Sequence, residues 1–152
     1  RWESIAWLQR QTTLPIILKG ILHPQDALQA QRLGFAGVVV SNHGGRALEG
    51  SPASLAVLPQ VRAAVGDDFM LLLDGGIRRG SDVFKALALG AQAVLLGRPQ
   101  AYGLGAAGAL GVAQMLRLLR EELELTMALA GCATLADISS ACLVNPNEFS
   151  SC

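Results

Sequence analysis

The sequence lacks an excess of charge of either sign. Its 12 lysines and arginines are balanced by 12 aspartates and glutamates, and only 16% of its 152 residues are charged. Binding to nucleic acid or to an anionic membrane needs a basic surface, which this composition does not supply. Long apolar runs are also absent. The run from Met70 to Leu73 stops at Asp74, well short of the roughly 20 residues that cross a bilayer. We therefore expect no nucleic-acid partner and no transmembrane segment.

Cysteine and histidine are scarce. The three cysteines, Cys132, Cys142 and Cys152, have no CxxC spacing and are odd in number, which favours a reduced, intracellular protein. No secretory signal sequence is recognisable, so the expected location is the cytoplasm. The only two histidines, His23 and His43, lie far from the cysteines in the sequence. We expect no metal site.

The chain does contain four short apolar runs. Hydrophobic residues make up 51% of the sequence, enough for one domain with a substantial core. None of the runs alternates with polar residues, so each is typical of a strand covered on both faces, as in a parallel sheet. The expected strands are residues 15–19, 37–41, 69–74 and 93–97.

Helix signals separate these runs. Pro24 suits a first helical turn with His23 as its cap, and Gly34 and Gly90 are placed to end helices. Ser81 and Asp82 are typical caps for a third helix. The expected helices span about residues 2–8, 24–33, 51–65, 81–89 and 111–129. This order predicts consecutive βα units joined by short loops.

Polar residues gather where the apolar runs end. In βα proteins the carboxyl ends of parallel strands share one edge, where ligands bind and chemistry takes place. The strand starts carry no such groups. The four run ends read Lys19-Gly20, Ser41-Asn42-His43-Gly44, Asp74-Gly75-Gly76 and Gly97-Arg98.

The last two run ends suit a phosphate group. Gly75 and Gly76 allow the backbone to approach an anion closely, and Arg78 supplies charge just before the next helix begins. Gly97 and Arg98 repeat the arrangement one unit later. A phosphate held between the last two βα loops is common in the (β/α)8 barrel.

Four segments of the chain, taken together, resemble one enzyme family. They are KGI, SNHGGR, LDGGIRRGSDVFKALALGA and LLGRP, one at each run end. The family is that of the FMN-dependent L-2-hydroxy-acid oxidases and dehydrogenases, which includes glycolate oxidase, lactate oxidase and mandelate dehydrogenase. The resemblance implies an α/β fold, in which residues 1–152 form the C-terminal half (strands 5–8) of a (β/α)8 TIM barrel.

The resemblance implies three catalytic residues. His43 would be the base, taking a proton from the substrate's α-carbon, or from its hydroxyl if hydride moves instead; the sequence leaves both routes open. Imidazoles exchange protons near neutral pH, which suits this role. Arg46 would bind the substrate carboxylate as a bidentate fork. Lys19 would place positive charge against the pyrimidine end of the flavin.

The implied cofactor is FMN. Ser41 would hydrogen-bond the flavin or line the pocket, and Asp74 would accept hydrogen bonds from the ribityl hydroxyls. The glycines and arginines would hold the phosphate, while Arg79 would point to solvent. The complete expected set is Lys19, Ser41, Asp74, Gly75, Gly76, Ile77, Arg78, Gly97 and Arg98.

The implied activity is oxidation of an L-2-hydroxy acid to the 2-oxo acid, with the flavin reoxidised by oxygen or another acceptor. Two other interpretations stay open. One is an FMN barrel of the isomerase type that shares only the phosphate site, and the other is a non-catalytic half-barrel. The SNHGGR segment favours oxidation, because a base beside a carboxylate clamp suits a hydroxy acid.

Four βα units cannot close a barrel, and the first residue is Arg1 rather than Met. We expect the chain to be the C-terminal piece of a longer oxidase whose N-terminal half is absent from it and serves as its partner. The resemblance also implies a homo-oligomer, since related proteins are tetramers.

Overall fold

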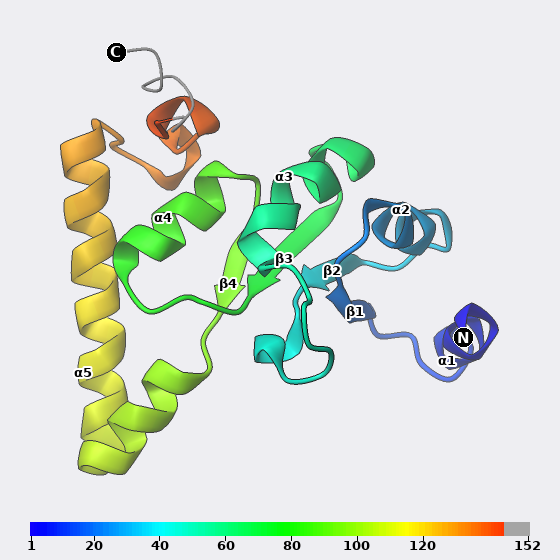
Figure 1. Cartoon of the computed structure of the whole chain (residues 1–152), viewed down its shortest axis with the longest axis horizontal. Coiled ribbons are helices and arrows are strands. Elements are labelled where there is room, and N and C mark those ends of the chain that lie inside the picture. Colours follow the sequence, from blue (N-terminus) through cyan, green and yellow to red (C-terminus); the bar gives the residue numbers. More distant parts are fainter. Residues whose placement is uncertain (145–152) are drawn as a thin grey trace.

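The computed structural model describes residues 1–144 and shows four parallel strands. They pair in chain order: β1 (Ile17–Ile21), β2 (Gly37–Val40), β3 (Met70–Asp74) and β4 (Ala93–Leu95). Each lies on one of the four apolar runs, so the predicted parallel α/β sheet is confirmed. Figure 1 shows the strands in the middle of the molecule, with helices to the left and right of them.

Five helices accompany the strands in residues 1–144, together with short 3-10 turns. The helices are α1 (Trp2–Gln9), α2 (Pro24–Arg32), α3 (Ser54–Val65), α4 (Gly80–Ala88) and α5 (Arg98–Ala130). The turns are η1 (His43–Gly45), η2 (Leu135–Asp137) and η3 (Ser140–Cys142). None of these helices is long and apolar enough to cross a membrane.

Helix α5 begins at Arg98, 13 residues before the expected start at Gly111. Its backbone breaks at Ala107 and at Gly108, which has a φ of +58°. A Cβ on Gly111 would lie 1.9 Å from the carbonyl oxygen of Gly103. The glycines therefore let the first part of α5 pack tightly against the rest, as the lower end of the helix in Figure 1 shows.

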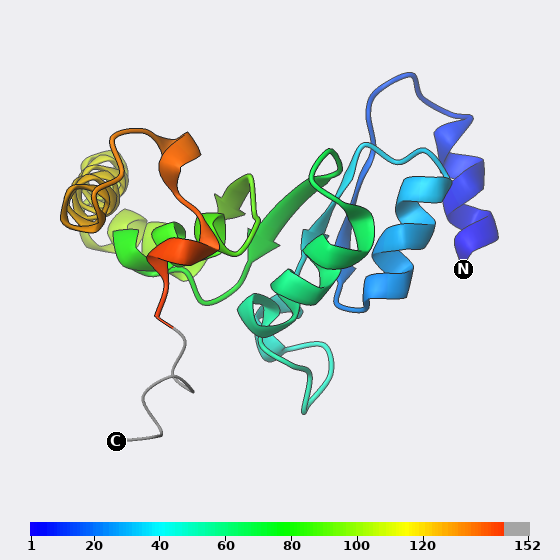
Figure 2. The ribbon, with the colours of Figure 1, turned by 90° about the horizontal axis from the view of Figure 1, so that it is seen from above.

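The core lies between the sheet and helices α2, α3 and α4. Leu71 and Leu73 of β3 are fully buried on that side, whereas Met70 is 40% exposed and Leu72 and Asp74 are half-buried. The expectation that every strand is covered on both faces is wrong for β1, β3 and β4, which have exposed residues, whereas all four residues of β2 are buried. In Figure 2, α2 and α3 lie together on one side of the strands.

Candidate active site

Lys19 lies in the middle of β1 rather than at its end. The strand continues to Ile21 because Gly20, with a φ of +99°, forms a bulge that shifts the register against β2. Bulges re-aim the side chains next to them. Here the Lys19 side chain reaches the carboxyl ends of β2 and β3.

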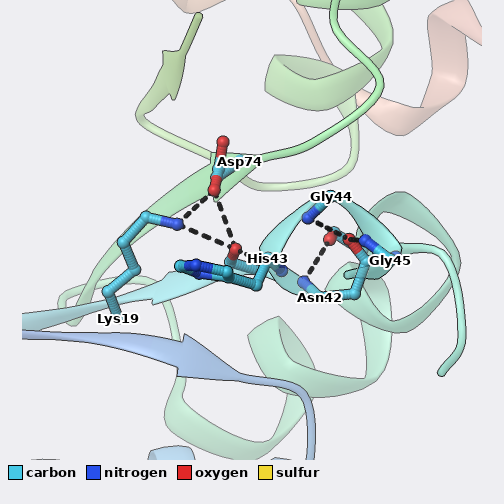
Figure 3. A network of polar contacts seen from close by, with 8 residues as sticks. Lys19, Asn42, His43, Gly44, Gly45 and Asp74 are labelled. Carbon is cyan, nitrogen blue, oxygen red and sulfur yellow. Dashed lines mark hydrogen bonds and ion pairs between the residues drawn. The ribbon is translucent and has the colours of Figure 1, made fainter. Parts of the chain in front are cut away.

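Three side chains from neighbouring strands form one hydrogen-bonded group. Lys19 Nζ donates to Ser41 Oγ at 2.9 Å and forms an ion pair with Asp74 Oδ2. The Ser41 hydroxyl donates to the same Asp74 oxygen at 2.8 Å. Figure 3 shows this group, with the imidazole of His43 extending from its loop toward Lys19. Ser41 is only 2% exposed, so it contacts Lys19 and Asp74 from the buried side of the group.

Asp74 is held in its charged form. Burial opposes ionisation, but hydrogen bonds from Lys19 and Ser41 outweigh it, helped by the positive charge of Lys19 and a smaller effect of His43. The pKa of Asp74 therefore lies below its ordinary value. A carboxylate that stays ionised is an acceptor only, which suits hydroxyl donors on a ligand.

Asn42 fixes the loop that follows β2. Its Oδ1 accepts from the N–H groups of Gly44 at 3.1 Å and Gly45 at 3.2 Å, and its Nδ2 donates to the Pro52 carbonyl. Between these anchors His43 has a φ of +58°, the only left-handed non-glycine residue in 1–144. Strained conformations of this kind concentrate at functional sites.

One cavity of about 340 Å³ opens beside this loop. His43 and Arg46, the two side chains expected to serve as base and clamp, both line it. Ten of the eleven expected site residues border it; only Ser41 does not. The full lining is Lys19, His43, Gly44, Arg46, Asp74, Gly75, Gly76, Ile77, Arg78, Leu95, Gly97, Arg98 and Pro99.

The start of α4 is arranged differently from the sequence expectation. Helix α4 begins at Gly80, and its terminal N–H groups already have partners. Those of Arg78 and Arg79 donate to Asp82 Oδ2, each at 3.0 Å, and that of Gly80 donates to Glu122 Oε2 at 2.8 Å. An anion in the cavity would therefore meet the glycine backbone and the first turn of α5 rather than these three N–H groups.

The cavity is strongly cationic. Lys19 and the guanidinium groups of Arg46, Arg78 and Arg98 border it, against the single carboxylate of Asp74. Among residues 1–144, none of these three arginines forms an ion pair. Unpaired guanidinium groups around a concave site favour an anionic ligand.

The backbone also fits a phosphate-bearing cofactor. Gly75 and Gly76 have φ values of +103° and +82°, and a Cβ built on Gly76 would meet nothing within 4 Å. The wall of the cavity is thus open at this point, beside Arg78. The residues that border the cavity fit FMN, which carries one phosphate and several hydroxyl groups.

Sequence reasoning missed three contributors. Leu95 and Pro99 line the cavity, and the buried hydroxyl of Ser54 accepts the Asn42 N–H at 3.1 Å. Leu95 was assigned only to a strand core, and Ser54 lies twelve positions from its partner. No pattern near Ser54 in the sequence indicates its role, whereas Pro99 could have been included because it directly follows Gly97 and Arg98, which were assigned to the phosphate site.

These features define a βα-barrel type of enzyme site: a cationic cavity at the carboxyl edge of a parallel sheet, with an imidazole and a guanidinium facing it. Comparison with known proteins narrows the class. Residues 1–145 match the profile of the FMN-dependent dehydrogenase family. The chain belongs to that family.

Individual relatives agree. The chain is 60% identical over 139 residues to an L-lactate oxidase of Alicycliphilus denitrificans, covering 91% of this chain and 38% of the relative. It is 54% identical over 147 residues to a peroxisomal (S)-2-hydroxyacid oxidase of Arabidopsis thaliana, covering 97% and 40%. The chain thus spans well under half the length of these relatives.

Solved structures match as well. A mandelate oxidase bound to 3,3-difluoro-2-hydroxy-3-phenylpropionic acid superposes with a TM-score of 0.88 and 48% sequence identity, over 92% of this chain and 42% of that one. The described fold is therefore part of a (β/α)8 barrel.

Proposed function

We propose that this chain supplies the flavin phosphate site and the catalytic base of an enzyme that oxidises an L-2-hydroxy acid to the 2-oxo acid. One observation carries the proposal: His43, Arg46 and Lys19 line the same cavity as the glycine loop and the two arginines at the ends of β3 and β4. The relatives named lactate, (S)-2-hydroxyacid and mandelate oxidase support it.

His43 is the proposed base. The Asn42 side chain accepts from the N–H groups of Gly44 and Gly45, the two residues that follow His43, and Ser41 Oγ accepts the His43 N–H at 3.0 Å. The backbone at His43 is therefore fixed before substrate arrives, which limits the reorganisation that proton transfer would need. Its task is to take the proton from the substrate's α-carbon or hydroxyl.

Arg46 is the proposed carboxylate clamp. It lies three positions after His43, lines the same cavity and has no ion-pair partner in residues 1–144. A guanidinium binds a carboxylate through two parallel hydrogen bonds, which fixes orientation as well as position. The clamp would thereby present the reacting carbon of the acid to His43.

The remaining residues fit the cofactor. FMN, when bound, supplies the two-electron acceptor for the oxidation. Arg78, Arg98 and the backbone of Gly75 and Gly76 would hold its phosphate, and the ionised Asp74 would accept hydrogen bonds from its ribityl hydroxyls. Lys19 would contribute positive charge, and Ile77 and Gly97 would complete the wall.

The open face of the sheet supports a missing partner. Met70 and Ile17 are 40% and 38% exposed on strands that are apolar apart from Lys19 and Asp74. We propose that the N-terminal half of the barrel covers this face and that this chain is the C-terminal half. A homo-oligomer and a cytoplasmic location complete the proposal.

The test uses the full-length protein that contains this chain. Purified protein should carry FMN, and its visible absorbance should bleach under anaerobic conditions on addition of lactate, glycolate or mandelate. His43→Gln should bind FMN yet lose about 10²–10⁴-fold in turnover, the range for loss of a general base. Arg46→Lys should mainly raise KM for the acid, and Arg79→Lys, an exposed arginine outside the cavity, is the matched control.

Other outcomes separate the alternatives. FMN binding without bleaching by any hydroxy acid would favour an isomerase-type barrel. Absence of FMN from the full-length protein, even after incubation with the free cofactor, would favour a non-catalytic half-barrel.

A further inference from the structure

Two thiols lie side by side away from the candidate active site. The sulfur atoms of Cys132 and Cys142 are 3.6 Å apart. Cys132 lies two residues after the end of α5, and Cys142 ends η3. Both pack with Phe84 and Ala88 of α4 in a small apolar cluster, in the segment that lies beside α4 in Figure 1.

The backbone fixes both residues. Gly131 ends α5 in the left-handed conformation, with a φ of +75°, and the Cys132 N–H donates to the Met127 carbonyl at 2.9 Å. The Cys142 N–H donates to the Ser139 carbonyl at 3.0 Å. The thiols therefore meet through folded structure, and a disulfide bond of about 2.0 Å needs only a small approach of the two sulfur atoms.

A third group borders both thiols. The Asp137 carbonyl oxygen is 3.8 Å from the Cys132 sulfur and 3.9 Å from the Cys142 sulfur, within hydrogen-bonding distance of each. The Asp137 side chain in turn accepts from the N–H and hydroxyl of Thr134. These bonds shape the loop between the cysteines and hold their sulfur atoms on the same side of it.

The two thiols differ in reactivity. Burial, then the hydrogen bond and charge of Cys142, raise the pKa of Cys132, which is only 6% exposed. Hydrogen bonds from the Ser139 backbone and from Cys132 lower the pKa of Cys142, which is only partly buried. Cys142 is thus the thiol better placed to react as a thiolate.

We propose that Cys132 and Cys142 form a reversible oxidation site for hydrogen peroxide. The Cys142 thiolate attacks one peroxide oxygen, the O–O bond breaks, and the departing hydroxide takes a proton to leave as water. This leaves a sulfenic acid on Cys142. The Cys132 sulfur then attacks the Cys142 sulfur, the S–O bond breaks, and the hydroxyl leaves as water with the Cys132 proton. Two thiols and one peroxide thus give one disulfide and two waters.

The inference rests on the proposed function only for the source of peroxide, which forms when oxygen reoxidises a hydroxy-acid oxidase. The site itself needs peroxide from any origin. Added peroxide therefore tests the thiol pair independently of hydroxy-acid turnover, and either proposal can fail while the other stands.

The experiment treats the flavin-loaded, full-length protein with hydrogen peroxide, removes the excess with catalase, denatures the protein and blocks free thiols with N-ethylmaleimide. Trypsin is unsuitable because no lysine or arginine lies between Cys132 and Cys152. A protease that cleaves after Glu and Asp separates the cysteines, since Asp137 lies between Cys132 and Cys142, and Glu148 lies before Cys152. Mass spectrometry then identifies linked peptides.

We expect residues 125–137 to be linked to residues 138–148 after peroxide, with loss of both maleimide adducts and full recovery of both thiols after dithiothreitol. Cys152→Ser should behave like the unchanged protein. In Cys132→Ser, dimedone should trap a sulfenic acid on Cys142, whereas Cys142→Ser should leave Cys132 reduced. Retention of both maleimide adducts after peroxide, or equally frequent pairing of Cys142 with Cys152, would overturn the proposal.

Discussion

The hydroxyl of Ser41 donates a 2.8 Å hydrogen bond to Asp74 Oδ2, and this bond joins the carboxyl ends of β2 and β3. Because Lys19 binds both residues, the same group also ties β1 to them. The candidate cavity is therefore bordered by a charged group that belongs to three strands. The free energy of unfolding of the protein should therefore depend on the ionisation of Asp74.

We predict that Asp74→Asn lowers the free energy of unfolding at pH 7 and that the difference from the unchanged protein narrows as pH falls. The folded state lowers the pKa of Asp74. Such a carboxyl stabilises the fold fully above its unfolded pKa and loses that contribution as pH falls through the folded pKa. The narrowing should therefore begin near pH 4, around the ordinary aspartate value, and continue below it.

Urea unfolding at a series of pH values from 7 to acid measures this effect. The matched control is Asp68→Asn, which removes an exposed carboxylate two residues before β3, beyond the opposite end of the strand from Asp74. A stability difference for Asp74→Asn that stayed constant with pH would contradict the ionised, ion-paired state of Asp74.

A second prediction concerns the left-handed backbone of His43. Replacement by Gly and by Ala should abolish the proposed base equally, but the two variants should differ in stability. An alanine at a φ of +58° bears the left-handed penalty of about 1–2 kcal/mol, whereas glycine does not, although glycine loses more conformational entropy on folding. We expect His43→Gly to exceed His43→Ala by up to about 1 kcal/mol in free energy of unfolding.

Thermal and urea unfolding of the two variants side by side provide the measurement. Ala47, which follows the same loop, serves as a control position, because the left-handed non-glycine conformation in residues 1–144 is confined to His43. At Ala47 the order should reverse, with glycine the less stable. If alanine were more stable than glycine at position 43, as expected at position 47, His43 would carry no backbone strain.

Local signals predicted the regular elements well. Pro24 begins α2, and the His23 ring caps it by accepting the Gln25 N–H at 3.2 Å. Gly34 and Gly90, each just past a helix, have φ values of +79° and +103°. These features were predictable because each depends on residues only a few positions apart. The four strands were predictable for the same reason.

Features that depend on distant residues were not predictable. The early start of α5 depends on contact between Gly103 and Gly111 across its break, and the glycine- and alanine-rich segment has no apolar period to reveal it. Trp7, in the helix predicted over residues 2–8, is 53% exposed although it is a large apolar side chain. Whether a single apolar side chain is covered depends on tertiary neighbours that its own helix does not specify.

In the candidate site, too, features set by nearby residues were predictable and features set by distant residues were not. The residues that border the cavity could be identified because they follow strand ends that must share one edge. The bulge at Gly20 was not identified from the sequence. The hydrogen bond from the Gly80 N–H at the start of α4 to Glu122 was not identified either, since Glu122 lies 42 positions from Gly80. Polar groups far apart in sequence give no local pattern.

A third prediction follows from the contact between α4 and α5. A Cβ on Gly80 would lie 2.1 Å from the Leu123 backbone nitrogen and 2.5 Å from the Glu122 carbonyl carbon. Both are backbone atoms, so the helices must separate. Gly80→Ala should therefore lower the free energy of unfolding by roughly 1–3 kcal/mol, the usual cost of overpacking, with a lower Tm by calorimetry.

The control is Gly105→Ala in α5. A Cβ there meets nothing within 4 Å, so alanine should raise stability by about 0.5–1 kcal/mol through its better helix propensity. Equal effects of the two substitutions would mean that the helices do not touch at Gly80.

The last prediction separates the two ends of the sheet. Arg62 of α3 lies at the amino ends of the strands, where its guanidinium donates to the Gly90 carbonyl at 2.7 and 3.1 Å and to the Phe69 carbonyl at 3.0 Å. Burial lowers the pKa of Arg62, partly offset by the Asp67 carboxylate. Arg62→Met leaves these carbonyls without their charged donor and should lower the free energy of unfolding by about 2–3 kcal/mol.

Arg98→Met provides the contrast, since Arg98 borders the cavity and forms no ion pair within residues 1–144. Fluorescence titration of the full-length apoprotein should show weaker FMN binding for Arg98→Met with little loss of stability without cofactor. Arg62→Met should bind FMN as tightly as the unchanged protein, measured below its lowered Tm, but should be less stable without cofactor. The exposed Arg32→Met should change neither quantity. Loss of FMN affinity in Arg62→Met to the same degree as in Arg98→Met would contradict this division, because the amino ends of the strands would then shape the cavity at the carboxyl ends.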